Sequence, residues 1–209
     1  MSTALLQTTY FGPIQWYQKL YRHEQTLIEQ HDTYQKQTYR NRCVIATANG
    51  LQALTVPVEA RSEENGKCLV KDIRISDHNQ WRRVHWNALQ SAYSESPFFD
   101  YYADDLRPFF EKRYDFLIDF NEAIRQKVCE LIDIHPSVAY TEEYIPAHAP
   151  QLSEMDDYRE VIHAKHPQPD SDFMPKRYWQ VFERKHGFQP NLSILDLLFN
   201  MGTESVFYL

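Results

Sequence analysis

The first thirty residues alternate between strand and helix patterns, and this alternation limits the folds that the chain can adopt. Residues Ala4–Thr9 form a short apolar run that predicts a buried strand. Gly12-Pro13 ends this run, and a proline suits the first turn of the helical pattern that continues to Tyr21. Thr26–Gln30 predicts a second strand. A strand, a helix and a strand in this order favour an α/β core with helices packed on a sheet.

A β-hairpin is the second clear pattern. Cys43–Thr47 and Leu51–Val58 are strand-like runs joined through Asn49-Gly50. Asn-Gly between apolar runs is the strongest short hairpin signal, because both turn residues are expected to need a positive φ. A polar loop, Ala60–Gly66, then leads to a further predicted strand at Leu69–Ile75.

The middle of the chain predicts helices. Ser76 or Asp77 can cap the first of them. A second begins after Ser96-Pro97, and Pro108 interrupts it. Asp115 is expected to cap the clearest helix. Its apolar stripe consists of Phe116, Leu117, Phe120, Ile124, Val128 and Leu131.

The last third of the chain is mostly polar. Val138–Thr141 predicts a strand, whereas residues 145–175 contain five prolines and little periodicity, which predicts a long loop or strap. Tyr178–Lys185 and Asn191–Asn200 predict two short helices. We therefore expect one helix-rich domain of α/β (or α+β) class over residues 1–209. It would hold a small, mostly parallel sheet with flanking helices, and the Asn-Gly hairpin inserted or at one edge.

The positions of the glycines exclude several nucleotide and hydrolase motifs. The five glycines are spread so widely that no two lie within ten residues of each other: Gly12, Gly50, Gly66, Gly187 and Gly202. A P-loop needs two glycines five residues apart, and a dinucleotide fingerprint needs three within six residues. The Gly-x-Ser-x-Gly nucleophile motif is absent for the same reason.

The net charge and the cysteines indicate which partners and which cellular location to expect for this chain. Lys and Arg total 22 against 29 Asp and Glu, a formal net charge of −7, which disfavours broad nucleic-acid binding. Cys43, Cys68 and Cys129 show neither zinc-site nor disulfide spacing, so reduced thiols and a cytoplasmic location are expected. The first 18 residues lack the basic region of a signal peptide, and no apolar run is long enough for a membrane span.

The segment Lys36-Gln37-Thr38-Tyr39-Arg40-Asn41-Arg42 is the main candidate for an anion site. Arg offers a planar fork that binds phosphate or carboxylate, and Lys offers a point charge. In this hypothesis Lys36, Arg40 and Arg42 hold a small anionic substrate, while Gln37, Tyr39 and Asn41 orient it. The alternative is a solvated loop whose cations pair with nearby acidic residues.

Further candidates come from the first strand–helix turn and from aromatic residues. Gln15 and Trp16 lie where a helix begins after a strand, a place where α/β proteins bind ligands. Tyr93 and Phe98 are candidate aromatic walls of a pocket. Packing in the aromatic core is the alternative for all four residues.

Histidines supply the candidates for acid–base or metal chemistry. His85 lies on the apolar face of a predicted helix and is the candidate general base, with Lys71 and Asp72 as possible partners. A hydrogen-bonded core histidine is the alternative. His163 and His166 are three residues apart, but Pro167 makes a helix there doubtful and no third ligand is apparent, so no metal is predicted.

Several of these motifs occur together, in order, in one known family. Tyr10-Phe11-Gly12-Pro13-Ile14, the Lys36–Arg42 segment and Leu54-Thr55-Val56-Pro57-Val58 resemble the WbqC-like protein family. So do Ile73-Arg74-Ile75-Ser76, His85-Trp86-Asn87-Ala88 and Ser96-Pro97-Phe98-Phe99, and the end of the chain, residues 191–202, resembles the branch of the family common in Bacteroidetes. The resemblance implies a link to the synthesis of surface polysaccharides or other envelope precursors. Gln7–Gly12 departs from the Gln-Pro-Asn-Tyr-Phe-Pro string of other branches.

Two classes of function fit these patterns. The first is a transferase or ligase that acts on a nucleotide-activated sugar or an acyl or aminoacyl group, with a nucleotide as the expected ligand moiety. The second is a non-catalytic binding or scaffold protein that partners a glycan-assembly enzyme, with its surplus of aromatic residues serving an interface. An enzyme would need a concave pocket where His85 and the Lys36–Arg42 segment converge.

Overall fold

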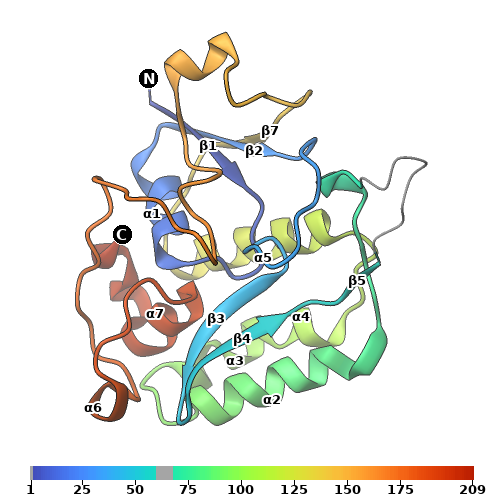
Figure 1. Ribbon diagram of the computed structural model, residues 1–209. Coiled ribbons are helices and arrows are strands. Elements are labelled where there is room, and N and C mark those ends of the chain that lie inside the picture. Colours follow the sequence, from blue (N-terminus) through green and yellow to red (C-terminus); the bar gives the residue numbers. More distant parts are fainter. Residues whose placement is uncertain (1, 60–67) are drawn as a thin grey trace.

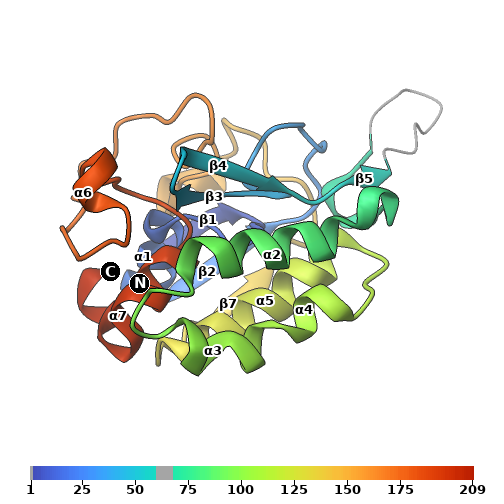
Figure 2. The ribbon, with the colours of Figure 1, turned by 90° about the horizontal axis from the view of Figure 1, so that it is seen from below.

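Four short parallel strands form the central sheet of the computed structural model, which describes residues 2–59 and 68–209. The strands are β1 (Thr3–Gln7), β2 (Gln25–Glu29), β7 (Val138–Tyr140) and β8 (Met155–Asp157), in the order β7-β2-β1-β8. All three pairings are parallel. Helices flank this sheet (Figures 1 and 2), so the predicted α/β class is confirmed.

The unit formed by β1, α1 (Ile14–Arg22) and β2 is the one that the sequence predicts. Ala4, Leu5 and Leu6 are all fully buried, as expected for a central parallel strand covered on both faces. Pro13 precedes the helix with a fixed φ of −67°, and the extended His23 ends it. Helix α1 packs against both β1 and β2.

The predicted hairpin is present as a separate two-stranded sheet. Strands β3 (Arg42–Thr47) and β4 (Gly50–Thr55) are antiparallel, and Thr47 pairs with Gly50. Ala48 and Asn49 therefore make the turn. Of the two residues Asn49 and Gly50, Gly50 alone has a positive φ, 105°, so the expectation of a positive φ at Asn49 as well was wrong. A second small antiparallel pair joins β5 (Val58–Glu59) to β6 (Arg74–Ile75).

Six α-helices besides α1 are described. They are α2 (Trp81–Tyr93), α3 (Phe99–Leu106), α4 (Pro108–Glu111), α5 (Leu117–Leu131), α6 (Glu183–His186) and α7 (Ile194–Met201). Pro108 separates α4 from α3, so the predicted interruption is confirmed, and Ser193 caps α7 by accepting a hydrogen bond from the Leu195 amide. Short 3₁₀ turns complete the chain: η1 (Val70–Asp72), η2 (His78–Gln80), η3 (Pro150–Glu154) and η4 (Gly202–Tyr208).

Several local predictions were wrong. Helix α5 begins after Phe116 without a side-chain cap from Asp115, and the Asp77 carboxylate pairs with Arg82 instead of capping α2. The strand predicted at 69–75 is formed only at its end, as β6, because residues 70–72 form the turn η1, and the helix expected from residue 178 begins only at Glu183. The polar loop predicted at 60–66 lies outside the described residues.

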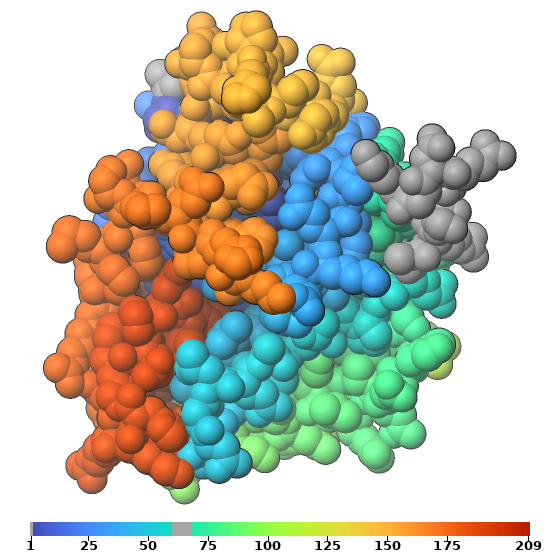
Figure 3. Space-filling model, viewed as in Figure 1, coloured from blue at the N-terminus to red at the C-terminus, as the bar shows by residue number. Residues whose placement is uncertain are grey.

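The segment of residues 145–175 contains more regular structure than the sequence indicates. It holds η3 and then β8, which is the edge strand of the parallel sheet beside β1. Most of the remaining residues have no helix or strand assignment and run across the surface of the amino-terminal third (Figure 3). This segment brings the residues that follow β8 close to the carboxyl ends of the strands.

Candidate functional site

The carboxyl ends of the four parallel strands meet at one edge of the sheet. The residues at this edge are Gln7 on β1, Glu29 on β2, Tyr140 on β7 and Asp157 on β8. In α/β proteins ligands bind at this edge because loops with free polar groups follow each strand there. We call the polar cluster at this edge the carboxyl-edge site. It consists of Glu29, Asp32, Arg40, Asn41, Asn121 and Arg159.

Glu29 lies at the centre of the edge with 1% of its surface exposed. One carboxylate oxygen accepts hydrogen bonds from the His31 amide at 2.8 Å and the Thr141 hydroxyl at 3.0 Å. The other accepts from the Ile145 amide at 2.9 Å. A buried carboxylate with this many donors is fully satisfied, so Glu29 joins the loops after β2 and β7.

Arg159, two residues beyond β8, adds a cation to the same edge. Its guanidinium makes a bidentate pair with the Asp157 carboxylate at 2.9 and 2.7 Å. Its Nη1 also donates to the Ile145 carbonyl at 2.6 Å and lies 3.5 Å from Glu29. This ion-pair network fixes the start of the surface segment after β8 on the sheet.

Arg40 is the second buried cation and has fewer partners than Arg159. Its side chain is 1% exposed, and Nη2 donates to the Asp32 carboxylate at 2.6 Å. Nη1 lies 3.4 Å from the Thr38 hydroxyl, and Nε has no hydrogen-bond partner among the described residues. Burial lowers the pKa of Arg40, while Asp32 acts in the opposite direction. The structure therefore holds a cation whose desolvation is only partly compensated.

Two further buried polar atoms without partners among the described residues belong to a residue next to Arg40 in the chain and to a residue bonded to its backbone. They are the amide oxygens of Asn41 and Asn121, both on residues that are 5% exposed or less. Asn121, on α5, donates to the Arg40 carbonyl at 2.8 Å and to the Thr8 hydroxyl at 3.1 Å, which joins these residues into one cluster. Buried polar groups without partners are rare in native proteins, and a water molecule, an ion or a functional role usually explains them.

His163 and Glu160, on the segment after β8, lie close enough to Arg40 to interact with its charge. The pKa of His163 is lowered by burial, with His166, Arg40 and Lys165 in the same direction and Glu160 opposing them. Its Nδ1 accepts hydrogen bonds from the amides of Lys165 and His166 at 3.1 and 3.2 Å. The proton of the neutral ring must therefore be on Nε2, which makes that atom a donor.

Comparison with known proteins identifies the family. The family model described as "WbqC-like protein family" matches residues 7–208. The chain belongs to the WbqC-like protein family. It is also 27% identical to the uncharacterized protein Rv1507c of Mycobacterium tuberculosis over 225 residues, which covers 99% of this chain and 96% of that protein. No solved structure matches the chain.

The sequence candidates of this WbqC-like chain are distributed over three regions. Arg40 and Asn41 belong to the carboxyl-edge site. Lys36 and Gln37 are exposed beside it, Tyr39 is half-buried, and its carbonyl accepts from the Tyr10 amide at 2.9 Å. Arg42 begins β3, where its Nε donates to the Thr55 hydroxyl at 3.2 Å. Four of the candidates therefore neighbour the site along the chain: Lys36, Gln37, Tyr39 and Arg42.

Gln15 and Trp16 are buried at the start of α1, and protein groups use their polar atoms. The Gln15 side chain donates to Asp170 at 2.8 Å and accepts from Asn191 at 3.0 Å. The Trp16 indole donates to the Gln7 carbonyl at 2.9 Å. The amides that open α1 bond to Leu192 and Asn191 in the same way.

His85 lies on α2 inside the core and is 4% exposed. Its Nδ1 is 2.9 Å from the Tyr10 hydroxyl, and the ring also bonds to the Thr55 backbone. Burial lowers the pKa of His85 to about 4, so the ring is neutral at pH 7. Its partners are therefore Tyr10 and Thr55, and not Lys71 or Asp72. Tyr10 connects the ring to the Lys36–Arg42 segment through the Tyr39 carbonyl.

Tyr93 and Phe98 lie away from the carboxyl-edge site, near α7. The Tyr93 hydroxyl donates to Asp196 at 2.8 Å, and the Phe98 ring packs against Gly202. Four polar residues of the carboxyl-edge site were not among the sequence candidates: Glu29, Asp32, Asn121 and Arg159. Glu29 lies near the carboxyl end of the predicted strand Thr26–Gln30 and Asp32 follows it, so the rule that ligands bind at carboxyl ends would have found them.

The described residues contain neither a cluster of metal ligands nor a helix that could span a membrane. In residues 2–59 and 68–209 no group of three or more His, Cys, Asp and Glu side chains is arranged to hold a metal ion. Within the same residues no helix has the length and apolar character needed to cross a membrane.

Proposed function

We propose that this WbqC-like chain is a transferase or ligase whose anionic, nucleotide-activated substrate binds at the carboxyl-edge site. The activated group is a sugar or an acyl group, in keeping with the link to envelope-precursor synthesis that the family resemblance implies. The observation that carries the proposal is the Arg40 guanidinium, which is 1% exposed and has an unpartnered Nε.

The chemistry of Arg40 suits a phosphate or carboxylate ligand. A guanidinium presents several N–H groups in one plane and binds such anions through two bonds at once. Here one edge of the plane binds Asp32, whose side chain is 17% exposed, so that carboxylate lies next to solvent. An anion at the remaining N–H groups would compensate the desolvation that lowers the pKa of Arg40.

Neighbouring groups supply the other contacts that a polar substrate needs. The Asn41 and Asn121 amide oxygens accept from hydroxyl or N–H groups, and the His163 Nε2–H donates. Lys36, Gln37, Tyr39 and Arg42 would contact the outer part of the ligand. His85 stays the proposed base, and its Nδ1 lies 2.9 Å from the Tyr10 hydroxyl.

The test is ligand-induced stabilisation with UDP-glucose and acetyl-CoA as probes. At 100 times its dissociation constant a bound ligand adds about 2.7 kcal/mol, which raises Tm by roughly 5–10 °C for a chain of this size. Arg40→Lys keeps the charge but loses the planar fork, and Arg40→Gln also removes the charge. Arg113→Gln is the matched control, because its side chain is 80% exposed.

We expect wild type and Arg113→Gln to be stabilised by one probe and both Arg40 variants to lose most of that shift. Circular dichroism spectra of the variants without ligand show whether they fold. Equal stabilisation of the Arg40 variants and wild type would refute the role of Arg40. No stabilisation of wild type by any nucleotide-activated probe would refute the transferase proposal and favour the non-catalytic binding protein.

A further inference from the structure

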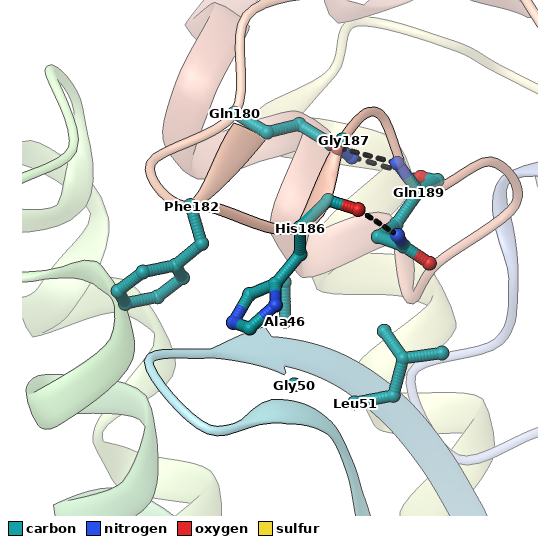
Figure 4. Close-up of a pocket in the computed structure, with 8 residues that line it drawn as sticks. All are labelled: Ala46, Gly50, Leu51, Gln180, Phe182, His186, Gly187 and Gln189. Atoms are coloured by element: carbon teal, nitrogen blue, oxygen red, sulfur yellow. Dashed lines mark hydrogen bonds between the residues drawn. The ribbon is translucent and has the colours of Figure 1, made fainter. Parts of the chain in front are cut away.

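A small cavity lies between the β3–β4 hairpin and residues 180–189, at the turn end of the hairpin and away from Arg42 (Figure 4). Its volume is about 170 Å³. An engineered protein cavity of about 150 Å³ binds benzene, so this space accommodates one ring. None of the residues of the carboxyl-edge site lines it.

One buried carboxylate holds both walls of the cavity in place. Asp196 on α7 is 1% exposed and accepts the Tyr93 hydroxyl at 2.8 Å, and that hydroxyl in turn bonds to the backbone of Ala46 on the hairpin side. On the other side Asp196 accepts from the Gln180 amide at 2.9 Å. Gln180 also donates to the Gln189 carbonyl and accepts from the Gln189 amide, both at 2.9 Å. The cavity is therefore preformed, as small-molecule sites usually are.

Two side-chain acceptor atoms are left free on the cavity wall. His186 Nε2 lies 3.1 Å from the Ala48 carbonyl, so this nitrogen carries the proton and Nδ1 is a bare acceptor. The Gln189 amide nitrogen donates to the His186 carbonyl at 2.9 Å, which leaves Oε1 as an acceptor. Figure 4 shows this oxygen on the same side of the His186 ring as Leu51. Neither atom has a hydrogen-bond partner among the described residues.

The surroundings of the cavity disfavour a charged ligand. Ala46, Leu51 and Phe182 provide apolar contacts. Lys185 donates to the Ala48 carbonyl at 2.7 Å beside the cavity, so its charge disfavours a cationic ligand. A carboxylate or phosphate would place its oxygens against two acceptors, which disfavours an anionic ligand as well.

We infer that this cavity is a second binding site, for a neutral single-ring compound with an N–H or O–H donor on an otherwise apolar ring. The ring packs against Leu51 and Phe182, and its donor bonds to His186 Nδ1 or Gln189 Oε1. The inference is independent of the proposed function, because it uses no residue of the carboxyl-edge site.

The test is a titration of ¹⁵N-labelled protein with phenol, followed by the amide signals of Gly50 and Gly187, which both line the cavity. Toluene is the isosteric probe without a donor. We expect phenol to move both signals and to bind about fivefold or more tightly than toluene, because toluene leaves the acceptors without a hydrogen bond. The Gly12 signal is the internal control, since Gly12 lies in the turn before α1.

Two variants make the assignment specific. Leu51→Trp fills the cavity from a side chain that is already 58% exposed, so the fold tolerates it. Tyr101→Trp is the control, a 74% exposed aromatic residue on α3. We expect Leu51→Trp to abolish the phenol-induced shifts and Tyr101→Trp to leave them unchanged. Equal affinities for phenol and toluene, shifts that persist in Leu51→Trp, or no shift of Gly50 and Gly187 in wild type would each overturn the inference.

Discussion

Gly202 and Gly187 offer a matched pair for measuring what one methyl group costs in this fold. Both have a positive φ, 58° for Gly202 and 72° for Gly187, so alanine is strained at either position. They differ in their surroundings. A Cβ at Gly202 would lie 2.9 Å from atoms of the Phe98 ring, whereas a Cβ at Gly187 would meet nothing within 4 Å.

The expected costs follow from this difference. A non-glycine residue in a sparsely populated backbone region costs about 1–3 kcal/mol, which applies to Gly187→Ala and Gly202→Ala alike. Gly202→Ala also forces the Phe98 ring to shift, and overpacking of this kind costs about 1–3 kcal/mol more. For a chain of this size the extra cost lowers Tm by roughly 2–4 °C per kcal/mol relative to Gly187→Ala.

The assay is urea unfolding of both variants and wild type, followed by far-UV circular dichroism. Phe98→Ala supplies the decisive comparison, because it removes the ring that the new methyl group would meet. We expect Gly202→Ala to cost less free energy of unfolding in the Phe98→Ala background than in wild type. The reasoning fails if the cost is the same in both backgrounds, or if Gly187→Ala is as destabilising as Gly202→Ala.

Three further predictions concern buried titratable groups. Burial lowers the pKa of His85 from 6.5 to about 4, so the protein is most stable above pH 6.5 and loses stability as the pH falls towards 4. The free energy of unfolding should be about 2 kcal/mol lower at pH 5 than at pH 7, and the difference should be smaller in His85→Gln. Asp196→Leu leaves two buried hydroxyl donors, those of Tyr93 and Tyr178, without their acceptor and should cost about 3 kcal/mol or more, measured by urea unfolding against the exposed control Asp100→Leu. Burial raises the pKa of Cys43 to about 12 and of Cys129 to about 11, so peptide mapping after iodoacetamide treatment at pH 8 should find both thiols unmodified in the native protein and modified in urea.

The elements that the sequence predicts well are those with strong local signals. The unit from β1 to β2 depends on an apolar run, a proline at a helix start and a second run, and all three features act within a few residues. Helix α2 and the β3–β4 hairpin are similar cases. The caps were less predictable, because Asp77 has a nearby cation, Arg82, that competes for its carboxylate.

In the candidate site, too, the sequence predicts local features better than features that depend on distant contacts. The Lys36–Arg42 segment attracts attention by composition alone, but composition does not separate Arg40, which is 1% exposed, from the exposed Lys36. That distinction arises from contacts distant in sequence, such as the bond from Asn121 to the Arg40 carbonyl. For His85, in contrast, the sequence does indicate whether the side chain is buried. Its helical face does predict burial, but not the Tyr10 hydroxyl as its partner, 75 residues away in sequence.

Strand β8 explains why Arg159 could not be predicted as a residue of the carboxyl-edge site. Its three residues, Met155–Asp157, include two aspartates and carry no strand signal of their own. They form a strand because the free edge of β1 offers unpaired backbone groups, and the pairing of Thr3 with Met155 satisfies them. Once β8 is placed, Arg159 must arrive at the carboxyl edge beside Glu29, and His163 must follow close to Arg40. The pairing of β8 with the open edge of β1 therefore places Arg159 and His163 at the carboxyl edge, and the residues of β8 do not signal this pairing by themselves.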